Sequence, residues 1–383
     1  SYCAIYLAKE MGLEVHAALA NTGGFSAEEL ARIEKRAYAL GVKSYVALDV
    51  TQDYYQHAIK YMIFGNVLKN STYPISVSSE RISQATAIAR YAREIGAYYL
   101  CHGSTGAGND QVRFDMIFNI VAPEIEVIAL IREKRLSREE EIEYLRSHGV
   151  DFDFKKAEYS INQGIWGTSV GGKETLTSSE TLPEEAYPSQ LKETEPRRVT
   201  LTFERGEFVA LDGKRYDDRI AAIQALQAVA SRYAVGRDMH VGDTIIGIKG
   251  RVGFEAAAPM VIIKAHHMLE KHTLTKWQLF WKDQISAFYG NHLHEGQYYD
   301  PVMRDMEAML ESSQRTVSGD VYVDLHPYRF VVVGIDSPHD LMSNRFGAYG
   351  ETMSDWTSED VKGFGRIFGN QNKIYYQVNK EKL

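Results

Sequence analysis

Alternating strand-like and helix-like segments through residues 13–148 constrain the fold of this chain more than any other feature. Apolar stretches of strand composition are followed by stretches whose apolar residues recur at helical spacing. Strands are predicted at 13–20, 44–50, 97–101 and 127–131, and helices at 2–11, 26–40, 52–64, 79–95 and from 137 onward. Strands joined by helices of this length pair in parallel through right-handed crossovers. The pattern predicts a doubly wound α/β domain, whose ligands bind beyond the carboxyl ends of the strands.

Two of these helices begin with a capping box, S-x-x-E, in which a serine and a glutamate each bond the other's backbone N–H. The pairs are Ser26 with Glu29 and Ser137 with Glu140. Ser1, in contrast, leads directly into the helical segment 2–11, and no strand stands before it. We therefore expect a strand and a loop to precede Ser1 in the native protein.

Beyond residue 150 the rhythm changes to that of an α+β domain. The expected order is a Gly/Ser stretch at 159–172, a surface loop at 173–197, a hairpin of 198–203 with 208–211, helices at 217–233 and 259–272, and strands at 321–325 and 330–335. Residues 352–383 form a polar tail, in which 374–378 would add an edge strand or dock on another subunit. The predicted division is an α/β domain at 1–150, an α+β domain at 151–351 and the tail.

Length and composition exclude several classes of protein. A chain of 383 residues is too long for one ordinary core, and no apolar run is long enough to cross a membrane. Only two cysteines, Cys3 and Cys101, are present, which favours a reducing cytosol and therefore a cytoplasmic protein. The net charge of −8 argues against a nucleic-acid partner bound through phosphate contacts.

The segment 102–114, HGSTGAGNDQVRF, is the richest candidate for a ligand site. It follows a predicted buried strand and precedes a helix, and its glycines let the backbone approach an anion at a helix N-terminus. Thr105, Asn109, Asp110 and Arg113 add polar side chains, of which the arginine suits a carboxylate or a phosphate. The same pattern also fits a tight turn whose Asn and Asp cap the next helix. It is not a Walker A loop, because no Lys-Ser/Thr pair follows the last glycine.

Two further polar stretches flank this segment. STYPISVSSER, at 71–81, crowds hydroxyl groups at the start of a helix, although Ser78 or Ser79 could simply cap that helix. YSINQGIWGTSVGG, at 159–172, fits an interdomain linker equally well. The histidine pairs at 266–267 and 292–294 do not present both rings from one helix face, so no metal site is predicted.

In this order and spacing the three stretches resemble the argininosuccinate synthase family. HGSTGAGNDQVRF fits the family pattern H-G-x-T-G-K-G-N-D-Q-V-R-F at every specified position except Ala107. Each of the other similar blocks also lies in the family order: TYPISVSSER, YSINQGIWGTSVGG, GRDMHVGDTIIGIKGR and EGQYYDP. The resemblance therefore covers nearly the entire chain.

The resemblance implies an adenine-nucleotide α-hydrolase-like domain at 1–150, a synthetase domain at 151–351 and assembly as a homotetramer. It implies ATP, with Mg²⁺, as a substrate beside citrulline and aspartate, in arginine biosynthesis. The ureido oxygen would attack the α-phosphate of ATP, and pyrophosphate would leave. The aspartate amine would then displace AMP from the adenylated ureido intermediate. Such chemistry depends on positioning and charge stabilisation, and it needs no protein nucleophile.

The resemblance also assigns site residues, with Asp110 and Arg113 as the catalytic pair and no protein-bound metal. The residues expected at ATP are Ser1, Ala20, His102, Gly103, Ser104, Gly106 and Gly108. Those expected at aspartate are Thr105, Asn109 and Asp110. Those expected at citrulline are Tyr73, Ser78, Asn109, Arg113, Ser160 and Ser169. The family's pyrophosphate loop, S-G-G-x-D-T-S, should end at Ser1.

Three positions depart from the family pattern. Ala107 replaces a lysine, Gly242 stands where a citrulline-binding glutamate is common, and Phe254 stands where a tyrosine is common. Gly242 offers no anion to an α-ammonium. Either the substrate is an N-acylated citrulline, or a shift of one residue brings Asp243 to the same task. Two other functions also stay open: another ATP pyrophosphatase that forms an amide or amidine, and a non-catalytic nucleotide-binding regulator.

Overall fold

The computed structural model describes residues 1–106, 108–150, 159–342, 347, 349–350, 355–380 and 382. They divide into two compact units, Ser1–His339 and Asp340–Leu383. The second unit consists of α13 (Ser358–Phe368) and α14 (Asn370–Asn379). The strand expected at 374–378 is therefore wrong. Its isoleucine, tyrosines and valine are all exposed within α14, and no neighbouring strand in the described part of the chain pairs with them.

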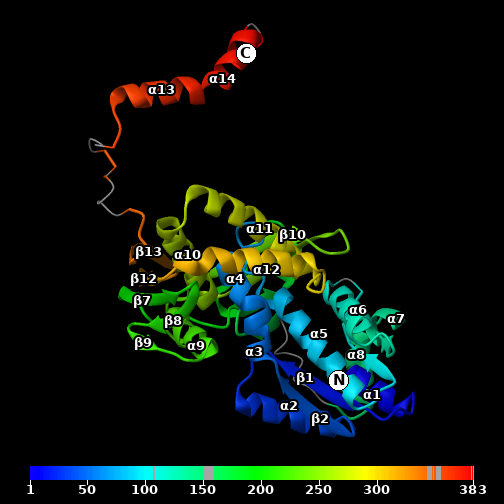
Figure 1. The fold of residues 1–383 in the computed structure, drawn as a ribbon. Helices are drawn as coiled ribbons and strands as arrows, with labels where there is room; N and C mark the ends of the chain where they lie inside the picture. Colours follow the sequence, from blue (N-terminus) through cyan, green and yellow to red (C-terminus); the bar gives the residue numbers. More distant parts are fainter. Residues whose placement is uncertain are drawn as a thin grey trace. The chain divides into compact units, whose positions relative to one another are not determined.

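The α/β part of the first unit has parallel strands, as the alternation predicts. β1 (His16–Asn21) pairs with β2 (Ser44–Asp49), and β3 (Tyr99–Cys101) pairs with β4 (Glu126–Ile128). Its helices are α1 (Tyr2–Lys9), α2 (Ala27–Ala39), α3 (Thr51–Tyr54), α4 (Lys60–Phe64), α5 (Ser76–Glu94), α6 (Asp110–Val121), α7 (Leu130–Lys134) and α8 (Arg138–Ser147). A π-helical turn, Tyr55–Ile59, joins α3 to α4. In Figure 1, α5 and α2 lie on opposite sides of the β1–β2 pair.

Local signals set most of these boundaries. Both predicted capping boxes are confirmed, at the start of α2 and of α8. The strand expected at 127–131 is wrong at its end, because β4 stops at Ile128 and α7 begins at Leu130. The helix expected from residue 79 begins earlier, at Ser76.

Antiparallel sheets and long helices form the rest of this unit. One sheet has the order β10-β11-β6-β5, and the other has the order β13-β12-β7-β8-β9. The strands are β5 (Ser160–Gly164), β6 (Gly167–Gly171), β7 (Arg197–Glu204), β8 (Glu207–Leu211), β9 (Lys214–Arg215), β10 (Arg237–Asp243), β11 (Lys249–Glu255), β12 (Gly319–His326) and β13 (Arg329–Asp336). The helices are α9 (Arg219–Ala230), α10 (Ala257–Thr273), α11 (Lys276–Glu295) and α12 (Val302–Ser313), with 3-10 turns at Lys173–Leu176, Glu184–Ala186, Ser231–Tyr233 and Gln314–Thr316.

Several expectations for this part are confirmed and one is wrong. The β7–β8 hairpin, α9, α10, β12 and β13 lie where the sequence predicts them. The stretch 159–172, however, is neither a loop nor a linker, because β5 and β6 form an antiparallel hairpin that pairs with β11. The surface loop expected at 173–197 also buries Leu182 and Ala186 against Val170.

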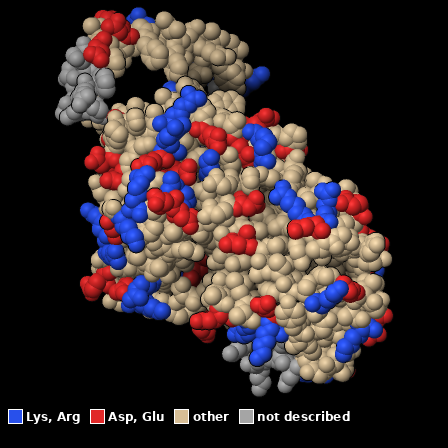
Figure 2. All heavy atoms as spheres, turned by 60° about the horizontal axis from the view of Figure 1, so that its bottom comes forward, with Lys and Arg blue, Asp and Glu red and all other residues tan. Residues whose placement is uncertain are grey.

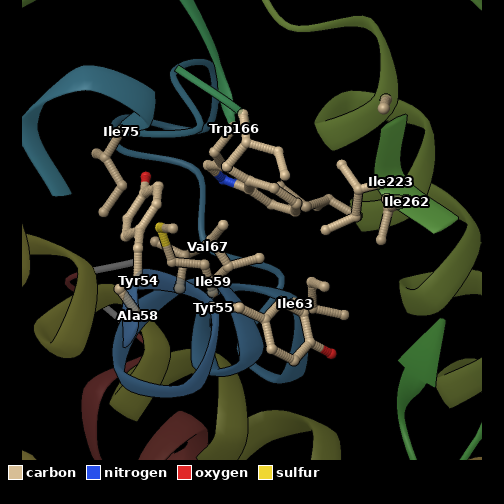
Figure 3. Close-up of a cluster of buried hydrophobic side chains, with 14 of the residues drawn as sticks. Tyr54, Tyr55, Ala58, Ile59, Ile63, Val67, Ile75, Trp166, Ile223 and Ile262 are labelled. Carbon is tan, nitrogen blue, oxygen red and sulfur yellow. The ribbon is translucent and has the colours of Figure 1, made fainter. Parts of the chain in front are cut away.

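A shared hydrophobic core connects the two parts of the first unit. Trp166, at the turn of the β5–β6 hairpin, is fully buried. Figure 3 shows its indole between Ile75 on one side and Ile223 with Ile262 on the other, above the helical turns that carry Tyr54 and Ile59. Because a large aromatic side chain buries much apolar area, this residue fixes the hairpin against the α/β part.

The described residues on the face drawn in Figure 2 show no large area of a single charge. On the face drawn in Figure 2, lysine and arginine alternate with aspartate and glutamate over the whole visible area. Within the described ranges, no helix is both long and apolar enough to cross a membrane.

Candidate ligand-binding site

One cavity of about 530 Å³ brings together most of the polar residues that the sequence singled out. Its wall comes from the start of α5, the glycine-rich segment before α6, the β5–β6 hairpin, β10, β11 and the end of α11. The part lined by Arg81 together with Gly103, Ser104, Thr105, Gly108, Asn109, Asp110 and Arg113 is called the loop side below. The part lined by Tyr73, Ser78, His240, Gly242 and His294 is called the strand side.

On the loop side, Asp110 lies between two arginines. Its Oδ2 accepts a hydrogen bond from Arg81 Nε at 3.0 Å, and its Oδ1 accepts one from Arg113 Nη1 at 2.8 Å. Arg113 Nε donates to the His294 carbonyl at 2.8 Å, whereas its buried Nη2 has no hydrogen-bond partner among the described residues. A guanidinium N–H left without a partner at a cavity wall is a donor suited to an anionic ligand.

The buried carboxylate of Glu80 fixes the position of Arg81. Glu80 accepts hydrogen bonds from Arg81 Nη1 at 2.9 Å and from the Thr22 hydroxyl at 2.6 Å. Burial raises the pKa of Glu80 to about 7, although the Arg81 charge opposes this. Burial also acts to raise the pKa of Asp110, but Arg81 and Arg113 together bring it below its ordinary value. Asp110 is therefore charged at neutral pH, whereas Glu80 changes charge close to neutral pH.

Side chains fix the glycine-rich segment at both ends. His102 Nε2 lies 2.8 Å from Asp115 Oδ1, and the other oxygen of Asp115 accepts from Arg132 at 2.6 Å. Asn109 does not cap α6 with its side chain; its Oδ1 instead accepts from the backbone N–H of Ile245 at 2.9 Å. The turn between β10 and β11 is thereby tied to the segment, whose glycine backbone is left at the cavity wall.

The start of α5 is built from a strained residue and a tyrosine. Ile75, fully buried, has a φ of 45°, a left-handed conformation that is rare for a β-branched side chain. The Tyr73 hydroxyl accepts from the Val77 N–H at 3.3 Å and so takes the place of a capping side chain. Because the helix begins at Ser76, the expectation that Ser78 or Ser79 caps it is wrong. Ser78 is instead available to the cavity.

The β5–β6 hairpin contributes two polar side chains. Trp166 Nε1 donates to the Pro74 carbonyl at 3.2 Å, which ties the hairpin to the residues just before α5. Asn162 and Ser169 face each other across the hairpin, and both line the cavity. Arg81 Nη2 reaches the Asn162 side chain at 3.4 Å. Folding of the hairpin is therefore what brings Ser169 to the site.

Two histidines dominate the strand side. The ring of His240 stacks on Tyr73 with centroids 5.1 Å apart, and its buried Nδ1 has no hydrogen-bond partner in the described part of the chain. His294 Nδ1 lies 2.9 Å from the Ser78 hydroxyl. Burial, with a smaller effect of Lys69, lowers the pKa of His240 to about 4. Burial, followed by the Arg113 and Lys69 charges, lowers the pKa of His294 to about 2. Both imidazoles are therefore neutral at neutral pH.

The structure also places the residues that depart from the family pattern. Phe254 is fully buried with its ring centroid 5.3 Å from that of Tyr73, so it packs behind the cavity wall. A Cβ atom on Gly242 would lie 2.5 Å from His240 Nε2, so a side chain there would require the His240 ring to move. Ala107 lies outside the described residues.

The cavity gathers most of the predicted site residues. Those that line it are Tyr73, Ser78, Gly103, Ser104, Thr105, Gly108, Asn109, Asp110, Arg113 and Ser169. Those that do not are Ser1, Ala20, His102, Gly106 and Ser160. Ser1 and His102 line a second cavity of about 550 Å³ between β1 and β3, and Ala20 is buried in β1. Ser160 is exposed at the start of β5.

Sequence reasoning did not assign several side chains that line this cavity, among them Arg81, Asn162, His240, Arg251 and His294. Arg81 carried a usable signal, since it lies beside Glu80 on the buried face of a helix, where an unpaired charge is costly. The two histidines lie more than fifty residues apart in the sequence, so only the fold brings them together.

Comparisons with known proteins point in one direction. Models of the arginosuccinate synthase N-terminal HUP domain and C-terminal domain match residues 1–151 and 159–375. The argininosuccinate synthase of Xanthomonas campestris pv. campestris is 37% identical over 390 residues, which covers 99% of this chain and 96% of that protein. The enzyme of Dictyoglomus turgidum is 34% identical, covering 91% and 87%. That of Methanocaldococcus jannaschii is 32% identical, covering 93% and 90%.

Proposed function

The chain belongs to the argininosuccinate synthase family, a family of C–N ligases, and we propose that it condenses a citrulline-type ureido amino acid with aspartate at the expense of ATP. One observation carries this proposal. A single cavity holds a glycine-rich segment, the Arg81–Asp110–Arg113 network and a group of hydroxyl and amide side chains. This set suits two amino acids and a phosphate ester, and among the residues that the structure describes it contains no cysteine or lysine nucleophile.

On the loop side we propose the nucleotide and aspartate. Backbone N–H groups of Gly103, Ser104 and Gly108 would line the phosphates. Gly106, Ser1, Ala20 and His102 lie outside this cavity, and we propose that the nucleotide extends to them, with Ser1 toward its pyrophosphate end and Ala20 toward its adenine. Thr105, Asn109 and Asp110 would hold aspartate, because a charged carboxylate at position 110 attracts its amine. The lowered pKa of Asp110 supports this role, since it keeps the carboxylate ionised.

The ureido amino acid would lie across the remaining wall, between the two sides. Arg113 has one guanidinium N–H without a partner among the described residues, which suits the α-carboxylate. The other contacts that we propose for this substrate come from Tyr73, Ser78, Asn109, Ser160 and Ser169. The substrate is either citrulline or an N-acylated citrulline.

The reaction proceeds in two steps that balance without a protein nucleophile. The ureido oxygen attacks the α-phosphorus of ATP, and the bond to the β-phosphate oxygen breaks, which releases pyrophosphate. The aspartate amine then attacks the ureido carbon, loses a proton, and expels AMP with the ureido oxygen. Arg113 and Asp110 hold the two amino acids at the reacting carbon, so their contribution is positional and electrostatic.

Mg²⁺ would supply charge neutralisation at the ATP phosphates. No group of three His, Cys, Asp or Glu side chains within the described ranges could hold a metal ion. Since Mg²⁺ binds readily to substrate phosphates with few protein ligands, we propose that it enters with ATP and leaves with pyrophosphate.

We propose a nucleotide-binding part at 1–150, a synthetase part at 151–351, and a tail at 352–383 that contacts other subunits of a homotetramer. The tail helix α13 carries Val361, Phe364, Ile367 and Phe368, which are exposed and recur at helical spacing. Such an unburied apolar face favours a second copy of the chain as its partner. Light scattering on the full-length protein tests this assembly, and a monomer would contradict it.

AMP release from the purified full-length protein tests the function. With ATP and Mg²⁺, we expect AMP only when aspartate and either citrulline or an acyl-citrulline are both present. AMP formed with ammonia in place of aspartate would indicate another ATP pyrophosphatase. Tight ATP binding without AMP under any of these conditions would indicate a non-catalytic regulator.

A further inference from the structure

The residues of strand β10 around Gly242 alternate between a buried face and an exposed face. His240 and Gly242 are buried and line the cavity, whereas Val241 between them is exposed. The Asp243 side chain is 66% exposed and forms an ion pair with Lys249 at 2.6 Å. Asp243 also lines the cavity, but its carboxylate is largely exposed and already paired with Lys249. It follows Gly242 on a strand whose successive side chains alternate in direction, so it does not stand in for a carboxylate at Gly242.

His240 occupies the space beside Gly242. Its Nε2 lies where any side chain at Gly242 would begin, at 2.5 Å from the position of a Cβ atom. The stacking of His240 on Tyr73 holds the ring in this place, and Phe254 supports Tyr73 from behind. The strand side therefore presents an imidazole at the point where an acidic side chain would otherwise enter the cavity.

Two buried polar atoms of this cavity lack partners. Among the described residues, neither His240 Nδ1 nor Arg113 Nη2 has one, although these residues are only 5% and 4% exposed. A buried polar atom without a hydrogen bond is costly, so a ligand group is expected to satisfy each. The ligand group at Arg113 must accept a hydrogen bond from a guanidinium, and the group at His240 must pair with a neutral imidazole.

The charges around the strand side oppose a further positive charge. The cavity is lined by Arg81, Arg113 and Arg251, and in the described part of the chain its carboxylates are Asp110 and Asp243, both already in ion pairs. The pKa of His240 is low because of burial and the nearby Lys69. The same surroundings that oppose a proton on this imidazole also oppose an α-ammonium group.

We propose that His240 determines substrate specificity and selects a citrulline whose α-nitrogen carries an acyl group over free citrulline. This inference rests on the proposed ligase function. An acylated nitrogen is uncharged, and its amide offers both an N–H donor and a carbonyl acceptor. Either tautomer of His240 can therefore pair with it through Nδ1, while Arg113 binds the α-carboxylate.

Kinetics with citrulline, N-acetylcitrulline and N-succinylcitrulline test this assignment on the full-length enzyme. We expect at least one acyl substrate to exceed free citrulline in kcat/KM by about tenfold or more, chiefly through KM. The double variant His240→Ala with Gly242→Glu restores an anion and gives it room. This double variant should change the ratio of kcat/KM for the preferred acyl substrate to kcat/KM for free citrulline. We expect the ratio to fall by about tenfold to a hundredfold.

Matched variants separate specificity from a general loss of structure. Val241→Thr changes an exposed side chain on the same strand and should leave the ratio unchanged. His240→Gln keeps a neutral hydrogen-bonding group and should retain the acyl preference, while Asp243→Ala should change the ratio less than about threefold.

Three results would overturn the inference. They are a clear preference of the native enzyme for free citrulline, equal efficiencies for all three substrates, and an Asp243→Ala variant that by itself reverses the preference. Each of these still shows ligase turnover. Absence of AMP with every ureido substrate would instead contradict the proposed function, so the two failures are distinguishable.

Discussion

The loop side and the strand side of the cavity solve the problem of buried charge in opposite ways. On the loop side, Asp110 lies between Arg81 and Arg113, so buried charges are kept and compensated. On the strand side, the polar side chains are Tyr73, Ser78, His240 and His294, and both histidines stay neutral because burial lowers their pKa. One part of the site is built from ion pairs, and the other from neutral polar groups.

The difference indicates which residues of the site can be substituted without leaving a buried charge uncompensated. A network of ion pairs is sensitive to the loss of a member, because a buried charge then loses part or all of its compensation. A neutral, stacked pair such as His240 and Tyr73 can be remodelled without that penalty. The loop side is therefore suited to chemistry that does not vary, and the strand side to the choice of substrate.

The largest effect is expected from breaking the loop side. Arg113→Ala removes the donor at Nη2 and the ion pair to Asp110, which Arg81 continues to hold. Loss of a charged hydrogen bond to substrate should lower kcat/KM by about tenfold to over a hundredfold. Arg93→Ala is the matched control, because that arginine is exposed and forms a surface ion pair with Glu124 at 2.6 Å. Near-native kcat/KM in Arg113→Ala, with an unchanged Tm, would show that the substrate lies elsewhere.

A smaller effect is expected from crowding the strand side. Gly242→Ala places a Cβ atom at 2.5 Å from His240 Nε2, so the imidazole must move away from its stacked position. We expect KM for the ureido substrate to rise about tenfold with little change in kcat. Gly250 faces Gly242 across the strand pair, and a Cβ atom there meets only Thr244 Cγ2, at 3.3 Å. Gly250→Ala should therefore have a smaller effect, and the reverse order would contradict the role of His240.

The last effect concerns the dependence of stability on pH, not turnover, and it sharpens the contrast in charge. Burial raises the pKa of Glu80 from 4.5 to about 7, so the native protein binds this proton more tightly than the unfolded chain. The resulting stabilisation is complete below pH 4.5 and is lost as the pH rises toward 7, by up to about 1.4 kcal/mol per pH unit. Glu80→Gln should remove this slope from urea unfolding between pH 5 and 7. The control variant Glu124→Gln, at an exposed glutamate, should keep the slope. If both variants show the same slope, Glu80 is not its source.

The fold was predictable from sequence where local signals decide it. The capping boxes at Ser26 and Ser137 fix two helix starts, and alternating apolar residues reveal β12 and β13. The β5–β6 hairpin was missed because its glycines hide the strand pattern, and it forms through pairing with β11 and burial of Trp166. The α14 segment was predicted as a strand because its aromatic and β-branched residues have strand propensity. It is a helix, and these residues have no strand to pair with in the described part of the chain.

The candidate site also has one part that was predictable from the sequence and one part that was not. Residues of the glycine-rich segment, such as Asn109 and Asp110, lie in one stretch and carry a recognisable pattern, so the loop side was predictable. The strand side joins Tyr73 and His240, which lie far apart in the chain and meet only through tertiary packing. That Gly242 lacks an acidic side chain was visible in the sequence, but the imidazole that takes its place was not.

Transfer of the ureido oxygen tests the central claim most directly, because only an adenylated ureido intermediate moves this atom to AMP. The full-length enzyme would be given ATP, aspartate and its ureido substrate labelled with ¹⁸O in the ureido group, and the released AMP would be examined by mass spectrometry. The account predicts that AMP carries the ¹⁸O label in proportion to the condensed product. Unlabelled AMP, formed while the condensed product accumulates, would contradict it.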